Sequence, residues 1–181
     1  MKTNTFYLDM DGVIADWNAG VRDILGYVKK DPNAHYPDRD WNRIKDNQRM
    51  YRNLPIMPRA GALVSLANAF KTQLGWNVLF LTAVPKGNDV PWAFWDKCLW
   101  AQDNFPGIPV HFGPFAKDKH VHCIPGDILV DDRRSNCEEW RAAGGVAVEV
   151  DATRYEDAIN EVKALFANHL AQLQLDDSDS R

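Results

Sequence analysis

The sequence predicts an α/β fold in which a doubly wound parallel sheet forms the middle of three layers, with helices on both of its faces. Two observations predict it. Short apolar runs of the kind that buried strands use alternate with stretches whose apolar residues recur at helical spacing. In a chain of 181 residues, 45% hydrophobic and 25% charged residues describe one domain of ordinary size with a sizeable core. Strands that alternate with helices indicate a parallel sheet.

The first strand is predicted over residues 6–8, which form a short apolar run. Two helices follow, because apolar residues recur at helical spacing over 16–28 and again over 41–54. A polar loop with two prolines separates them, and two further prolines close the second helix. We therefore expect residues 16–58 to form a small helical cap, inserted after the first strand and too polar to be a domain of its own.

Regular alternation resumes at residue 59, and residues 1–15 and 59–175 are predicted to form the α/β core. In order, the predicted elements are a helix over 59–75, a strand over 76–82, a helix over 91–104, strands over 108–112 and 127–132, a helix over 135–143 with Ser135 as its N-cap, a strand over 146–150 and a helix over 155–173. Residues 176–181 are polar, and we expect them to be frayed.

Composition limits the classes of partner and compartment. The net charge of −4 gives no basic footprint for nucleic acid. Three widely spaced cysteines argue against a disulfide framework and for a reducing compartment. No apolar run approaches the roughly 20 residues that span a bilayer, and the first strand begins too early to leave room for a signal peptide. We expect a cytoplasmic protein with a small-molecule partner and no membrane; the sequence leaves a homodimer open.

Asp9 and Asp11 end the first apolar run, and Gly12 follows them. Residues two apart in a strand point to the same face, so two carboxylates are expected side by side at the rim of the sheet. Repulsion between them calls for a divalent cation, and one of them could attack an electrophile while the other moves a proton. Alone, the pattern fits an Asp-x-Asp-Gly turn that caps the next helix equally well.

Other predicted strands also end in polar residues, and this favours the metal site over the turn. The residues are Asp9 and Asp11, then Thr82, then Asp131 and Asp132. Sites in open parallel sheets lie beyond the carboxyl ends of the strands, so these side chains are expected to gather at one edge. Four carboxylates with only oxygen ligands suit Mg²⁺ better than zinc. Positive charge for an anionic substrate is expected from the loops, at Lys86, Lys117 and Lys119.

This set of strand-end residues resembles the four motifs of the haloacid dehalogenase-like (HAD) phosphohydrolases. The matching residues are Asp9-Met10-Asp11-Gly12-Val13, Thr82, Lys119 and Asp131-Asp132. The resemblance covers residues 6–150 and implies a HAD-like Rossmannoid core, with Asp9 as the nucleophile that becomes an aspartyl-phosphate and Asp11 as the general acid and base. It further implies that Thr82 and Lys119 bind the phosphate and that Asp9, the main-chain carbonyl of Asp11, Asp131 and Asp132 hold Mg²⁺. Because both acids of the first motif are present, it implies a phosphatase rather than a dehalogenase.

Within that superfamily, the run from Asp9 to Trp17 looks like the opening of the 5′(3′)-deoxyribonucleotidases, where an aromatic residue follows Ala-Asp. Lys117-Asp118-Lys119 and Ile128 to Arg133 resemble the third and fourth motifs of that group, and Lys86 matches a lysine beside the phosphate. The resemblance implies a nucleoside monophosphate substrate, with Trp17 stacked on the base. Ala83 stands where those enzymes carry serine, and the cap is shorter, so that Tyr36, Trp41 and Tyr51 do not align with their base-contacting aromatics.

Several interpretations stay open at the level of sequence. Trp17 fits a core position as well as a base contact, and Trp41 and Tyr51 are expected to pack between the two cap helices. Lys117 competes with Lys119 as the phosphate lysine and is otherwise a substrate contact. Arg133 touches the substrate or closes a turn. The alternative functions are a polynucleotide 3′-phosphatase, a phosphatase of sugars or other small metabolites, and a non-catalytic domain that keeps the fold.

Overall fold

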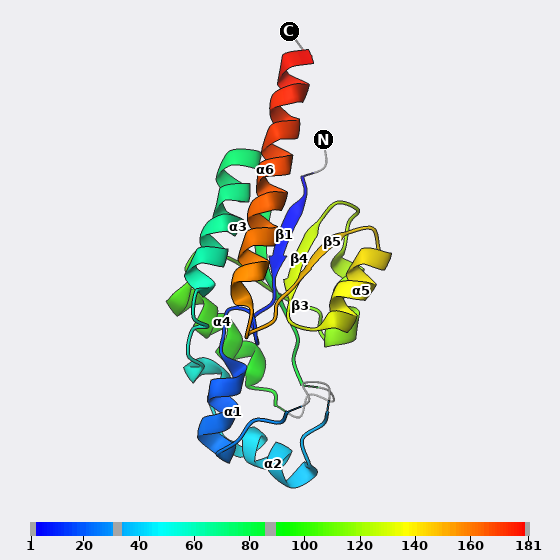
Figure 1. Ribbon diagram of the computed structural model, residues 1–181. Coiled ribbons are helices and arrows are strands. Elements are labelled where there is room, and N and C mark those ends of the chain that lie inside the picture. The colour runs from blue at the N-terminus through cyan, green and yellow to red at the C-terminus, as the bar shows by residue number, and fades with distance from the viewer. Residues whose placement is uncertain (1–2, 31–33, 86–89, 180–181) are drawn as a thin grey trace.

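The computed structural model describes residues 3–30, 34–85 and 90–179, with side chains up to residue 175. Five strands form one parallel sheet in the order β3-β2-β1-β4-β5 (Figure 1). They are β1 (Thr5–Leu8), β2 (Asn77–Thr82), β3 (Val110–Phe112), β4 (Ile128–Asp131) and β5 (Val146–Glu149). The order starts at β1 and grows outward in both directions, as in a doubly wound sheet. The predicted fold class is confirmed.

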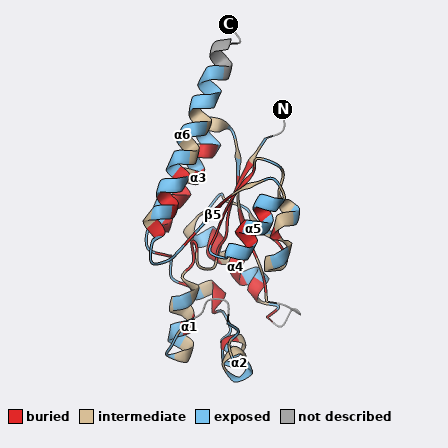
Figure 2. Cartoon of the chain, turned by 45° about the vertical axis from the view of Figure 1, so that its right-hand side comes forward, coloured by how far each residue is buried: buried red, intermediate tan, exposed pale blue. Residues whose placement is uncertain are grey.

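Helices cover both faces of the sheet, and the central strands are buried between them (Figure 2). Successive strand residues point to opposite faces, so Phe6 and Leu8 pack in one hydrophobic cluster and Tyr7 in the other. The larger cluster includes residues of α3 (Ala60–Leu74), α4 (Ala93–Asn104) and α6 (Tyr155–Asp179). The smaller one includes residues of α5 (Arg134–Ala142), which lies beside the 3₁₀ helix η3 (Ala116–His122).

The last helix is longer than predicted. It ends at Asp179 instead of residue 173, so residues 176–179, which we expected to be frayed, have helical backbone. Its first half packs against α3, and its second half projects past the sheet (Figure 1). No glycine or proline follows residue 173 to end the helix there. None of the helices in the described part of the chain is both long and apolar enough to cross a membrane.

The cap comprises α1 (Trp17–Leu25), α2 (Asp38–Asp46) and the 3₁₀ turn η1 (Tyr51–Asn53). The helix predicted over 41–54 is wrong in its bounds: α2 begins earlier and ends at Asp46. Arg49 has a φ of 68°, in the left-handed region, and an α-helix cannot continue through that backbone. The cap lies beyond the carboxyl ends of the strands (Figure 1).

The cap is fixed to the core by α4. Trp100 is fully buried, and its Nε1 donates a hydrogen bond of 2.7 Å to the carbonyl of Leu54, directly after η1. Two backbone hydrogen bonds, from Asp16 to Pro55 and from Met57 to Ile14, close the base of the insertion. These contacts hold η1 above the carboxyl edge of the sheet.

Candidate active site

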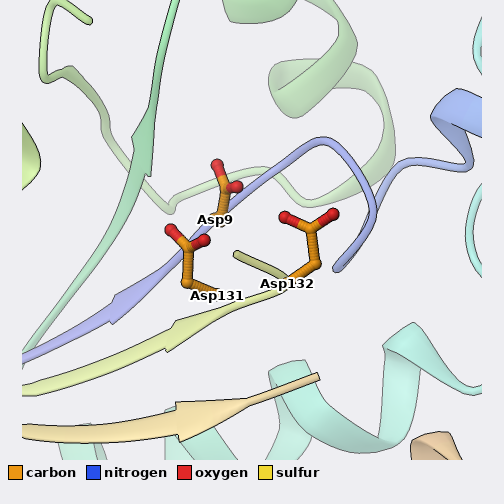
Figure 3. Close-up of side chains that lie close together, drawn as sticks. All are labelled: Asp9, Asp131 and Asp132. Atoms are coloured by element: carbon orange, nitrogen blue, oxygen red, sulfur yellow. The ribbon is translucent and has the colours of Figure 1, made fainter. Parts of the chain in front are cut away.

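Two neighbouring strands deliver the central acids to one edge of the sheet. β1 and β4 pair in parallel with Leu8 opposite Val130, and the N–H of Asp9 donates to the carbonyl of Val130 at 2.9 Å. Asp9 and Asp131, the next residues, therefore emerge side by side. Figure 3 shows their carboxyl groups and that of Asp132 directed to the same side of the edge.

Asp9, Asp131 and Asp132 could hold a metal ion together. One oxygen of each lies within 4.8 Å of the others; Asp9 and Asp131 are buried and Asp132 is exposed. A donor set of carboxylate oxygens, one of them on an exposed residue, fits Mg²⁺, which keeps several waters and takes only a few protein ligands. The Asp11 carboxylate, which the sequence grouped with them, lies outside this cluster.

Gly12 lets Asp132 approach the loop after β1. Its φ is 84°, and a Cβ built on it would lie 2.4 Å from Oδ2 of Asp132. Any other residue would pay for the left-handed backbone and push Asp132 away from the cluster. The glycine of the Asp-x-Asp-Gly sequence is thus part of the site.

Asp9 is held in one orientation. Its Oδ1 accepts hydrogen bonds from the N–H of Met10 at 2.7 Å and from Nζ of Lys119 at 2.8 Å. Burial raises the pKa of Asp9 to about 6; Lys119 opposes the shift, while the charges of Asp131 and Asp11 add to it. Lys119 therefore offsets burial and the neighbouring negative charges only in part, and a further cation would offset more of them.

Asp131 is fully buried, and protein groups bond both of its oxygens. Its Oδ2 accepts from Lys119 at 2.6 Å, the Nδ2 of Asn136 bonds both oxygens at 2.9 and 3.0 Å, and the N–H of Arg133 donates to Oδ1 at 2.9 Å. The sequence reasoning missed Asn136. Its signal was an amide in the first turns of a helix that begins directly after the acids, where it can reach back to them.

Lys119 lies between Asp9 and Asp131, whereas Lys117 is exposed on η3. Burial disfavours the charge of Lys119, but Asp131 and Asp9 outweigh burial and hold its pKa above the ordinary value of a lysine. Of the two rivals named from the sequence, Lys119 is the one at the acids. Lys86 lies outside the described residues.

A second lysine, which the sequence reasoning missed, bonds Asp11. Lys97 of α4 is 1% exposed, and its Nζ lies 2.5 Å from Oδ2 of Asp11 and 2.8 Å from Oγ1 of Thr82. The signal was its place on the buried face of α4, spaced one turn from Ala93 and one from Ala101. A lysine on an apolar face needs a buried partner, and here the partner is Asp11, the second acid of the Asp-x-Asp-Gly sequence.

Aromatic side chains border this second acid. Tyr51 of η1 is buried, stacks on Trp17 with 5.4 Å between ring centroids, and contacts Trp92 at 5.7 Å. Nζ of Lys97 lies 4.8 Å from the centre of the Tyr51 ring. Tyr51 was expected to pack between the two cap helices; it contacts Trp17 of α1 as expected, but its other aromatic neighbour is Trp92 at the start of α4.

The remaining candidates lie at the margin. Trp17 is half-buried in the first turn of α1, and Asp16 caps that helix by accepting from the N–H of Ala19. Arg133 is exposed and takes the N-cap position of α5, which the sequence assigned to Ser135. Burial and then the charge of Asp11 raise the pKa of Tyr51, and the charge of Arg133 lowers it.

Solved structures with a similar fold include two hydrolases. A HAD hydrolase of family IA, variant 3, from Entamoeba histolytica HM-1:IMSS is 13% identical, with a TM-score of 0.43 over 84% of this chain and 86% of that chain. A hydrolase from Pseudomonas syringae is 10% identical, with a TM-score of 0.41 over 88% of this chain and 90% of that chain. Comparison with models of protein families and with curated proteins finds no match. The likeness to solved structures therefore spans most of each chain at low sequence identity.

Proposed function

We propose that this protein is a Mg²⁺-dependent phosphomonoesterase that forms an aspartyl-phosphate on Asp9 and acts on nucleoside monophosphates. One observation carries the proposal: two acids two residues apart have different surroundings. Asp9 is buried among carboxylates and bonded to Lys119, whereas Asp11 stands apart from that cluster and pairs with Lys97. Two acids with separate environments can take separate roles at one site.

The first half-reaction transfers the phosphoryl group to the enzyme. An oxygen of Asp9 attacks phosphorus as the bond from phosphorus to the ester oxygen breaks, and that oxygen keeps the electron pair and takes a proton from Asp11. The hydroxyl of Thr82 and the ammonium of Lys119 hold the phosphate oxygens. Lys119 also holds the attacking carboxylate in place, because it bonds Oδ1 of Asp9.

The second half-reaction returns the enzyme to its starting state. Asp11, now ionised, takes a proton from a water molecule whose oxygen attacks phosphorus. The bond between phosphorus and the Asp9 oxygen breaks, which regenerates the Asp9 carboxylate and releases inorganic phosphate. Asp9, Asp131 and Asp132 would hold the Mg²⁺, which cancels charge between the anionic substrate and the carboxylates.

The nucleotide part of the proposal rests on the cap. The run from Asp9 to Trp17 resembles the deoxyribonucleotidases, and Trp17 lies half-buried against Tyr51 beside the second acid. The partly exposed ring of Trp17 could stack on any of the bases. A 5′- or 3′-monophosphate whose phosphate lies at Asp9 would direct its base toward the cap.

A phosphate-release panel tests the proposal. Wild-type protein with Mg²⁺ would be assayed on 5′- and 3′-nucleoside monophosphates, a 3′-phosphorylated oligonucleotide and sugar phosphates, with Asp9→Asn as the control. We expect fastest release from mononucleotides and none with the variant. Faster release from the oligonucleotide or from sugar phosphates would overturn the nucleotide part, and activity that survives Asp9→Asn would overturn the phosphatase mechanism.

A further inference from the structure

Lys97 joins two groups on which the proposed chemistry depends. Its ammonium is within hydrogen-bond distance of the Asp11 carboxylate and of the Thr82 hydroxyl, which come from different strands. Burying an ammonium is costly unless it is paired and bonded, and Lys97 is among the largest fully buried side chains of the described residues. The hydrogen bonds to Asp11 and Thr82 therefore keep the ammonium of Lys97 in its position.

The two oxygens of Asp11 have different partners. Oδ2 accepts from Lys97, while Oδ1 is buried and has no hydrogen-bond partner within the described part of the chain. A buried acceptor without a partner is costly and calls for an explanation. A reacting oxygen that arrives with the substrate would supply the missing partner. Because a carboxylate is planar, fixing Oδ2 also fixes the direction of Oδ1.

The cap holds Lys97 from the opposite side. The ammonium lies over the face of Tyr51, an attractive arrangement when both groups are shielded from water. Tyr51 is kept there by Trp17 and Trp92, and the hydrogen bond from Trp100 to Leu54 fixes η1 on the same helix that carries Lys97. Lys97 thus connects Tyr51 of the cap with Asp11.

We propose that Lys97 is a positioning residue: it holds Asp11 so that Oδ1 exchanges the proton with the leaving oxygen, and Tyr51 keeps Lys97 in place. This inference rests on the proposed function. Lys97 provides the second ammonium of the site from α4, in addition to Lys119 from η3.

Leaving groups of different basicity separate this role from a merely structural one. An alkoxide needs the proton from Asp11, whereas p-nitrophenolate leaves without it. Values of kcat/KM cover the steps up to the aspartyl-phosphate, so they would be measured for an alkyl phosphate and for p-nitrophenyl phosphate. General acid catalysis contributes about 10²–10⁴-fold, and misplacing the acid should remove part of that. Lys97→Met should lower kcat/KM about 10–100-fold on the alkyl ester and less than about 5-fold on p-nitrophenyl phosphate.

Four companion variants make the test decisive. Lys97→Arg keeps the charge and should recover part of the activity on the alkyl ester. Lys71→Met, at an exposed position of α3, should change neither rate. Asp11→Asn should show the same dependence on the leaving group, and adding Lys97→Met to it should cost little more, since both changes remove one function.

Each outcome supports or overturns the inference. Equal losses on both esters, or no loss on the alkyl ester, would overturn it while the wild-type activity still supports the proposed function. A wild-type protein inactive on both esters would overturn the proposed function and this inference with it. If Lys97→Met does not fold, Tyr51→Leu leaves the lysine in place and should show the same leaving-group dependence to a smaller degree; equal effects on both esters in that variant would overturn the inference.

Discussion

At the scale of single residues, the site is a set of charges that the backbone brings close and that protein groups only partly compensate. Asp9 has a pKa raised to about 6 by burial, against the opposing effect of Lys119 and with added effects of Asp131 and Asp11. In the unfolded chain, the pKa of an aspartate is about 4. A carboxyl group whose pKa is higher than this in the folded state stabilises the fold at pH values below about 4. The contribution is lost as the pH rises through the folded pKa.

Asp9→Asn should therefore change how stability depends on pH. In metal-free buffer, the free energy of unfolding of the wild type relative to the variant should fall by about 1–3 kcal/mol between pH 4 and pH 7, because only the wild type has a carboxyl that can ionise at position 9. Urea unfolding at several pH values in that range measures the difference. Asp46→Asn, at an exposed cap position, serves as the control. A difference that does not vary with pH would contradict the assigned environment of Asp9.

Gly12 offers a second residue-scale prediction, with a matched control in the same chain. Gly12 and Gly26 have φ of 84° and 81°, but only a Cβ at Gly12 would meet Asp132; nothing lies within 4 Å of a Cβ at Gly26. Both alanine variants should lose about 1 kcal/mol of stability from the left-handed backbone. Only Gly12→Ala should also weaken the rise in Tm that Mg²⁺ produces. Equal Mg²⁺ responses in the two variants would show that Gly12 has no part in the metal site.

At the scale of elements, α4 is the helix on which both the cap and the second acid depend. Its buried face presents Lys97 to Asp11 and Trp100 to Leu54, while Trp95 on the same helix is 67% exposed. The two tryptophans lie on one element with opposite surroundings. The same change, tryptophan to phenylalanine, can therefore be made at both positions to test how the cap is held to the core.

Trp100→Phe should loosen the cap and Trp95→Phe should not. The first change removes a buried hydrogen bond and leaves the Leu54 carbonyl unsatisfied, which should cost about 1–3 kcal/mol of stability. It should also lower phosphatase activity, because η1 carries Tyr51. The second change should stay within about 0.5 kcal/mol. Urea unfolding and phosphate release give the two readouts, and similar losses in both variants would contradict the role of the Trp100 hydrogen bond.

The elements also show how far sequence reasoning reached. Strands and helices of the core were predictable because each buries apolar residues at a regular period, as β4 and α3 do. The bounds of α2 were not, since they depend on the left-handed backbone of Arg49, which no periodicity reports. Lys97 and Asn136 were missed because their partners come from other elements. When the partner of a side chain lies far away in the sequence, the residues around that side chain do not indicate the contact.

At the scale of the whole molecule, the topology brings the ends of β1, β2 and β4 to one edge and gathers their charge there. With all four acids ionised, Asp9, Asp11, Asp131 and Asp132 would carry four negative charges against the two positive charges of Lys97 and Lys119. The site in the ionised state thus has an excess of two negative charges before substrate arrives. A divalent cation would neutralise it, and only then could a phosphate dianion approach without net repulsion.

Mg²⁺ should accordingly stabilise the folded protein, and Asp132 should govern that effect. Binding to the folded state alone raises stability by about 2.7 kcal/mol when the free ion is at 100 times its Kd, which appears as a higher Tm. Asp132→Asn removes the one exposed ligand of the cluster, so we expect the Mg²⁺ response to be largely lost. The metal-free Tm of that variant should equal or exceed the wild-type value, because a like charge next to Asp9 and Asp131 is gone. Thermal unfolding with EDTA and with Mg²⁺ measures both effects, with Asp46→Asn as the control for loss of an acidic residue. A wild type that does not respond to Mg²⁺, or a variant that responds in full, would contradict a metal site at Asp9, Asp131 and Asp132.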